Sequence, residues 1–133
     1  MEISYKESKI FSEEELFALF DSVGWLSARY SARLVRALAG SSTVFSAWDG
    51  EKLVGLINAL DDGELTAYIH YLLVDPEYHG LGIGKHLALS IREKYSDYLY
   101  IVLIAEKTES IKFYEKLGFK VTGGATPLDV THL

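Results

Sequence analysis

Three alternate glycines, Gly80, Gly82 and Gly84, follow a segment that ends at Pro76. Glycine leaves no side chain between the main chain and a ligand. Apolar residues at helical spacing come next, and the first turn of a helix has N–H groups without intrahelical acceptors. These N–H groups and the partial positive charge of the helix N-terminus attract an anion. We call this run the glycine cradle (residues 80–85), and it is predicted to hold a phosphate or pyrophosphate; a glycine-rich turn without a ligand is the alternative interpretation.

Two common phosphate-binding motifs do not fit the glycine cradle. A P-loop, G-x-x-x-x-G-K-[ST], that ends at Gly84-Lys85 needs a glycine and a hydroxyl residue where the chain has His79 and His86. The dinucleotide fingerprint G-x-G-x-x-G needs a glycine where the chain has Lys85 or Leu87. The sequence therefore excludes both motifs.

The same run resembles motif A of the Gcn5-related N-acetyltransferases, the GNAT family. The resemblance is carried by Val74-x-Pro76 and by x-Gly80-x-Gly82-Ile83-Gly84-x-x-Leu87. A second segment, Ser110-Ile-Lys-Phe-Tyr-Glu-Lys-Leu-Gly-Phe119, is similar to the last helix of that family and to the Gly-Phe that ends it. The two motifs stand in the family's order, are separated by one apolar run, and cover roughly the C-terminal half of the chain.

The resemblance implies acetyl-CoA (coenzyme A) as cofactor, with its pyrophosphate held by main-chain amides. The residues implied to bind it are Leu72, Val74, His79, Gly80, Leu81, Gly82, Ile83, Gly84, Lys85 and Lys107. Leu72 and Val74 contribute main-chain groups, because a bulge near Leu72 in this family splays the strand from its neighbour. His79 stands where the family usually has Gln or Arg, and Lys107 where many members have Asn. Lys107 then either reaches a phosphate or is solvated.

Tyr114 is the candidate general acid. Adjacent helical residues point about 100° apart, so Phe113 and Tyr114 cannot share a face. Phe113 pairs with Leu117 at i+4 and faces the core, which turns Tyr114 toward an adjacent surface. The resemblance implies that a tyrosine here lies near the cofactor sulfur and protonates it; a half-buried packing tyrosine is the alternative.

His70 is the candidate general base. Its unperturbed pKa of about 6.5 suits proton abstraction near neutrality. Tyr68, Tyr71, Glu64 and an ordered water are the alternatives, and His70 as a packed strand residue is another. Many family members carry an acidic residue near this position, which this chain lacks.

Length and composition predict one α/β domain over residues 1–133. The chain has 133 residues, of which 49% are hydrophobic and 24% charged, enough to bury a core. No apolar run reaches the roughly 18 residues of a membrane span, and the N-terminal residues lack the apolar core of a signal peptide. We therefore expect a cytoplasmic protein without a membrane partner.

Cysteine usage and charge exclude several functions. The absence of cysteine excludes disulfides, thiolate metal sites and a cysteine nucleophile, and no metal site is expected. A net charge of −6 without a basic stretch argues against nucleic-acid binding and is compatible with a cationic amine substrate.

The elements that position these residues are predicted in the order β-α-α-β-β-β-α-β-α-β(β), a GNAT-like mixed sheet. A helix begins after Ser12, which forms a capping box with Glu15, and its apolar stripe includes Phe17. A second helix runs from Ser27 to Gly40 with Tyr30 inward. The remaining predictions are strands over 2–5, 43–48, 53–60 and 65–74, a helix over 83–95, a strand over 98–104 buried on both faces, a helix over 109–117, and one or two strands after Phe119.

Three functions are compared. The leading one is an N-acetyltransferase that moves an acetyl group from acetyl-CoA to the amine of a small molecule or amino acid by direct attack in a ternary complex. The second is an acyl-CoA-binding sensor or regulator without turnover. The third is an interaction module, a homodimer whose sheet edge is the C-terminal tail.

Overall fold

The computed structural model of the protein describes residues 2–132. Within them a five-stranded sheet has the order β1-β2-β3-β4-β5, in which β1 to β4 pair antiparallel and β5 runs parallel to β4. The elements in chain order are β1 (Ile3–Glu7), α1 (Glu13–Ser22), the 3-10 helix η1 (Leu26–Tyr30), α2 (Ser31–Ala39), β2 (Thr43–Asp49), β3 (Lys52–Asp61), β4 (Thr66–Val74), the 3-10 helix η2 (Pro76–Tyr78), α3 (Ile83–Lys94), β5 (Tyr100–Val102) and α4 (Thr108–Lys116). None of the helices formed by these residues is long and apolar enough to cross a membrane. The predicted α/β class and mixed sheet are confirmed.

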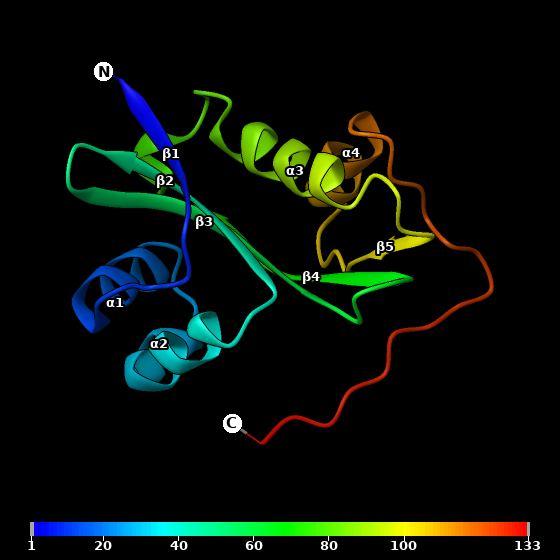
Figure 1. Ribbon diagram of the computed structural model, residues 1–133, viewed down its shortest axis with the longest axis horizontal. Coiled ribbons are helices and arrows are strands. Elements are labelled where there is room, and N and C mark those ends of the chain that lie inside the picture. The colour runs from blue at the N-terminus through cyan, green and yellow to red at the C-terminus, as the bar shows by residue number, and fades with distance from the viewer. Residues whose placement is uncertain (1, 133) are drawn as a thin grey trace. The chain divides into compact units, whose positions relative to one another are not determined.

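Helices cover both faces of the sheet (Figure 1). The helices α1 and α2 lie on one face, over a buried cluster that contains Phe20 of α1 and Leu56 of β3. The helix α3 lies on the other face, where its buried residues Ile83 and Leu87 approach Gly55 of β3. Because the glycine cradle (residues 80–85) includes the first turn of α3, the packing of this helix on the sheet fixes the position of the cradle.

The helix α1 begins with the predicted capping box. The Ser12 hydroxyl oxygen accepts from the Glu15 N–H at 3.1 Å, and the Glu15 carboxylate accepts from the Ser12 N–H at 2.8 Å. The prediction that Phe17 faces the core is wrong, since its side chain is 48% exposed. The buried side chains include Leu16 and Phe20, and Phe17 points about 100° away from Leu16.

The second helix differs from its prediction at the start. The predicted start at Ser27 lies within the 3-10 helix η1, which begins at Leu26, and the α-helix begins only at Ser31. Tyr30 is 38% exposed, so the prediction that it faces inward is wrong. A 3-10 turn has about 3.0 residues instead of 3.6, and this shifts Tyr30 out of the stripe that buries Leu34 and Leu38.

The C-terminal part corrects two further predictions. The strand expected over 98–104 is shortened to β5, and its residues Tyr100 and Val102 are 59% and 44% exposed instead of buried on both faces. The cause is its place at the end of the sheet, where β4 is its single neighbour among residues 2–132. Residues 119–132 contain no strand, contrary to the prediction. Residues from Ile104 onward form a second compact unit, which contains α4.

Gly55 provides a test of the packing between α3 and the sheet. A Cβ at this position would lie 3.2 Å from both Ile83 Cγ2 and the Leu73 carbonyl oxygen, which is held in the sheet. We expect Gly55→Ala to lower the free energy of unfolding by about 1–2 kcal/mol, measured by urea titration. The control is Gly123→Ala, where the added methyl meets open space and a change within about 0.5 kcal/mol is expected. Equal stabilities for the two variants would show that α3 does not pack closely on β3.

Candidate functional site

The glycine cradle has an open main chain. Gly80 and Gly82 have φ angles of +82° and +78°, in the left-handed region that favours glycine, and within the described part of the chain nothing lies within 4 Å of a Cβ built on either. Gly82 is the N-cap of α3 and supplies no side-chain cap. No side chain at position 80 or 82 therefore covers the first N–H groups of α3. An anion needs such uncovered N–H groups in order to bind.

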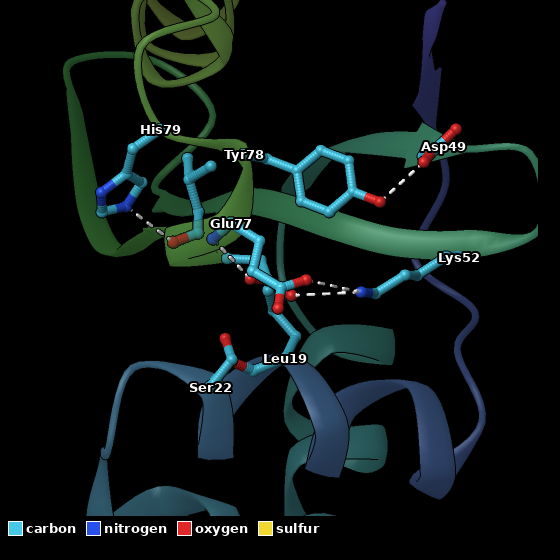
Figure 2. A network of polar contacts seen from close by, with 9 residues as sticks. Leu19, Ser22, Asp49, Lys52, Glu77, Tyr78 and His79 are labelled. Atoms are coloured by element: carbon cyan, nitrogen blue, oxygen red, sulfur yellow. Dashed lines mark hydrogen bonds and ion pairs between the residues drawn. The ribbon is translucent and has the colours of Figure 1, made fainter. Parts of the chain in front are cut away.

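The turn before the cradle is tied to the β2–β3 hairpin (Figure 2). The hydroxyl of the buried Tyr78 donates to Asp49 at 2.6 Å, and this hydrogen bond raises the pKa of Tyr78 to about 12. Asp75 accepts from the N–H of Glu77 at 3.0 Å and lies 3.5 Å from the Lys52 ammonium. These contacts hold η2, and with it the entry to the cradle, against the rigid end of the hairpin.

His79 turns its ring back onto the end of β4 (Figure 2). Its Nε2 lies 3.1 Å from the carbonyl oxygen of Val74, a distance at which the N–H form donates a hydrogen bond. Its own N–H donates to the carbonyl of Pro76 at 3.2 Å. The structure therefore brings His79 and Val74 together and shows what the imidazole contacts.

The strand β4 contains a bulge beside Asn58. Ile57 pairs with Leu72 but Ala59 pairs with Ile69, so Asn58 alone faces both His70 and Tyr71. The buried Asn58 accepts from the Tyr71 N–H at 2.8 Å through its side chain. The bulge expected near Leu72 therefore lies one to two residues before it.

The main chain of Leu72 and Val74 points to an open sheet edge. The N–H groups of Tyr71 and Asp75 both donate toward β3, to the Asn58 side chain and to the Val54 carbonyl respectively. Because main-chain direction alternates along a strand, Leu72 and Val74 direct their N–H and C=O groups to the opposite edge. Along that edge β5 pairs with β4 only over residues 66–68. In the part of the chain that the structure describes, no strand pairs with this edge beyond residue 68.

The bulge places His70 and Tyr71 on the same face of the sheet. Their rings stack at 4.0 Å with an angle of 24°, and the Tyr68 ring follows at 5.9 Å from His70. His70 is exposed but its ring stacks against two neighbouring rings, and the partial burial of the imidazole lowers its pKa below 6.5. Among residues 2–132 no hydrogen-bond partner lies at either ring nitrogen. His70 is therefore neutral near pH 7 and has a lone pair available.

Tyr114 and Lys107 belong to the second unit. The Tyr114 ring lies between Phe113 at 5.1 Å and Phe119 at 5.4 Å, and burial raises its pKa to about 12. The phenol is therefore protonated at neutral pH, as a general acid must be. Phe113 is only half-buried, and Leu117 is the buried residue of this helix end. Lys107 is the exposed N-cap residue of α4.

The remaining predicted cradle residues have distinct surroundings. Leu81 is 53% exposed and Lys85 is exposed, whereas Ile83 is the buried first residue of α3 and Gly84 lies in the first turn of that helix. Asn58 and Tyr78 position the site but belong to no motif, so the motifs did not predict them. The polar Asn58 inside the apolar run 53–60 is a signal that could have indicated the first.

The fold and the motifs agree with comparisons to known proteins. Residues 9–119 match the family described as "Acetyltransferase (GNAT) family". The chain is 33% identical over 126 residues to the "Uncharacterized N-acetyltransferase ycf52" of Pyropia yezoensis, covering 89% of this chain and 70% of that protein. It is 34% identical over 128 residues to the "GCN5-related N-acetyltransferase 2, chloroplastic" of Arabidopsis thaliana, covering 80% of this chain and 49% of that protein.

A solved structure supports the same assignment. The "Acetyltransferase, GNAT family protein SP0256" of Streptococcus pneumoniae superposes with a TM-score of 0.85 at 28% identity, and the similarity covers 98% of each chain. The chain belongs to the GNAT family, and the names of its relatives support its assignment as an acetyltransferase. It spans 70% and 49% of the two curated relatives named above.

The environment of His70 predicts a pH-dependent stability. The lowered pKa means that the unfolded chain binds this proton more tightly than the folded one does, so stability falls as the pH drops below about 6.5. We expect His70→Gln to lose less stability between pH 7 and pH 5 than the wild type, measured by urea unfolding. An NMR titration of the imidazole with a midpoint at or above 6.5 would contradict the prediction.

Proposed function

We propose that the protein transfers an acetyl group from acetyl-CoA to the amine of a small molecule or amino acid by direct attack in a ternary complex. The observation that carries the proposal is the open main chain on two adjoining segments. These are the glycine cradle, where Gly80 and Gly82 leave the start of α3 uncovered, and the edge of β4 at Leu72 and Val74, which no strand of the described residues pairs with and where His79 contacts the Val74 carbonyl. Family membership supplies the general class of reaction.

The residues present fit coenzyme A at this place. Main-chain N–H groups of residues 80–85 would hold its pyrophosphate, because they lead into the N-terminus of α3, whose first N–H groups have no intrahelical acceptor and no side-chain cap. The exposed Lys85 in the first turn of α3 and Lys107 in the second unit would add positive charge. Leu72 and Val74 would bind the pantetheine arm through N–H and C=O groups. When bound, acetyl-CoA supplies the acetyl group as an activated thioester.

Two side chains are proposed to move protons. A ring nitrogen of His70 accepts a proton from the acceptor ammonium, since this imidazole is neutral near pH 7. The Tyr114 hydroxyl donates its proton to the thiolate that leaves, since burial keeps this phenol protonated. Tyr68, Tyr71, Glu64 and water remain the other candidates for the base.

Location and assembly are also proposals. We propose a cytoplasmic protein; the name of the Arabidopsis relative assigns that protein to the chloroplast, which is the alternative. A homodimer is the proposed assembly, with the exposed residues Tyr100 and Val102 of β5 at the end of the sheet. A sensor that binds acyl-CoA without turnover would bind the cofactor and release no free thiol with any amine.

Gly82→Ala is a direct test of the glycine cradle. At a hundredfold excess over its Kd, acetyl-CoA should stabilise the wild type by about 2.7 kcal/mol, measured as a shift in Tm. The variant should lose most of this shift, because the new methyl group stands in the open space of the cradle. Gly63→Ala is the control: its φ of +85° gives the same backbone strain and its surroundings are equally open, but it lies in another turn. If millimolar acetyl-CoA does not raise the Tm of the wild type, the proposal that acetyl-CoA is the cofactor is refuted.

Tyr114→Phe tests the proposed general acid. Removal of a group that acts mainly in the transition state should lower kcat about a hundredfold and leave the acetyl-CoA Kd nearly unchanged. Tyr100→Phe, on an exposed tyrosine of β5, serves as control and should retain activity. The rate is measured as release of free thiol. An unchanged kcat in Tyr114→Phe would show that Tyr114 is a packing residue and not the general acid.

A further inference from the structure

Three arginines form a stripe on η1 and α2 that the proposed function does not use. This arginine stripe comprises Arg29 in η1 and Arg33 and Arg36 in α2, at spacings of four and three residues. Leu34 and Leu38 are buried on the side of α2 that faces the sheet (Figure 1), whereas all three arginines are exposed. The arginine stripe therefore faces solvent along roughly 10 Å of helix.

The arginine stripe lies in a segment whose charge is opposite to that of the rest of the chain. Residues 22–48 contain three of the four arginines and no Asp, Glu or Lys, which gives a charge of +3. Because the whole chain carries −6, the remaining residues carry −9. The first turn of α2 has no acidic residue, whereas that of α1 has three, so the dipole of α2 adds to the positive potential. Positive charge is thus concentrated on one small surface.

The arginines of the stripe have no ion-pair partner within residues 2–132. Lysines elsewhere do: Lys52 lies 3.5 Å from Asp75, and Lys94 lies 2.7 Å from Glu7. Like charges three and four residues apart on a helix destabilise it. The fold therefore gains nothing from the charges of the stripe, and an external anion would relieve their repulsion.

The surroundings of the arginine stripe favour a compact acidic partner. Leu26 and Tyr30, which are 48% and 38% exposed, lie beside the arginines and offer apolar contact. Tyrosine and arginine are enriched at the energetic centres of protein interfaces, and a guanidinium pairs with a carboxylate through two hydrogen bonds. A long DNA duplex or an anionic membrane would also meet the surface that carries −9 and would be repelled by it. A short acidic segment meets only the stripe.

We propose that the arginine stripe docks a second protein through an amphipathic acidic helix. The carboxylates of this helix are spaced four and three residues apart, which matches the spacing of the arginines. Its apolar residues pack on Leu26 and Tyr30, which adds area to the ion pairs. None of these residues belongs to the glycine cradle or to the groups proposed to move protons. Docking is therefore independent of acetyl transfer.

A helical peptide of defined charge tests the docking. The probe is an alanine-rich peptide with Glu at positions i, i+4 and i+7 and Leu beside them, and its counterpart has Gln in place of Glu. In NMR titrations at low salt the amide signals of residues 29–37 should shift, with a Kd about tenfold lower for the Glu peptide. This difference should vanish in about 0.5 M salt. Equal Kd values, or no shift at these residues, would overturn the proposal.

Two variants that remove the same charge locate the effect. The test variant changes the whole stripe and should bind the Glu peptide about tenfold more weakly: Arg29→Gln/Arg33→Gln/Arg36→Gln. The control removes three exposed lysines in and after α4 and should bind like the wild type: Lys112→Gln/Lys116→Gln/Lys120→Gln. Equal weakening in both variants would mean that net charge alone drives binding, and would overturn the proposal.

Stability and other anions provide two further checks. Because the arginines repel one another, the stripe variant should have the same urea midpoint as the wild type or a higher one; a lower midpoint would assign the arginines a structural role and overturn the proposal. A DNA duplex of about 20 base pairs and phosphatidylserine vesicles should bind more weakly than the Glu peptide. Tighter binding of either, lost in the stripe variant, would overturn the protein partner. None of these measurements needs acetyl-CoA, so this proposal and the proposed function can fail separately.

Discussion

The hydrogen bond from the Tyr71 N–H to the buried Asn58 side chain is the constraint on which the site depends. An unsatisfied buried N–H would cost about 1–3 kcal/mol, and the Asn58 amide provides the acceptor that the bulged backbone lacks. It also donates to the Ser41 hydroxyl at 3.1 Å, which fixes its orientation. With this bond in place, one extra residue in β4 has two effects. His70 joins Tyr71 on the α1 face, and Leu72 and Val74 present their main chain to the edge that β5 leaves free.

The two halves of the site are fixed by different parts of the scaffold. The bulged strand is held by β3 and by Phe20 of α1, whereas the glycine cradle is held by η2 and α3. At the far side of α3, His86 stacks on Tyr5 of β1 with 3.5 Å between ring centroids. The start of α3 is therefore anchored to the opposite end of the sheet. The main chain of the cradle stays open because the surrounding elements hold it in place. No side chain within the cradle is needed for this.

Local patterns made most of the fold predictable. The capping box at Ser12 and the apolar stripe of α3 are each encoded in a few consecutive residues, and the structure confirms them. Predictions failed where a neighbour distant in sequence decides. The apolar run 98–104 is typical of a buried strand, yet β5 ends the sheet and exposes Tyr100. Tyr71, whose N–H donates to Asn58, lies thirteen residues away in the sequence. No spacing rule indicates that a buried side-chain amide will accept the N–H that a bulge leaves without a main-chain partner. The open main chain at Gly80 and Gly82 was predictable because glycines mark it, whereas nothing in the sequence indicated that Trp25 contacts Tyr71 of β4.

The contact of His79 with Val74 changes what the free edge of β4 offers to a ligand. The Val74 carbonyl is not bare in the free protein, because the imidazole already donates to it. A ligand amide that takes the place of the ring at this carbonyl exchanges one hydrogen bond for another, so the net gain is small. His79 therefore caps the carbonyl at the end of β4 in the free protein, and its imidazole would swing outward on two side-chain torsions if a ligand displaced it.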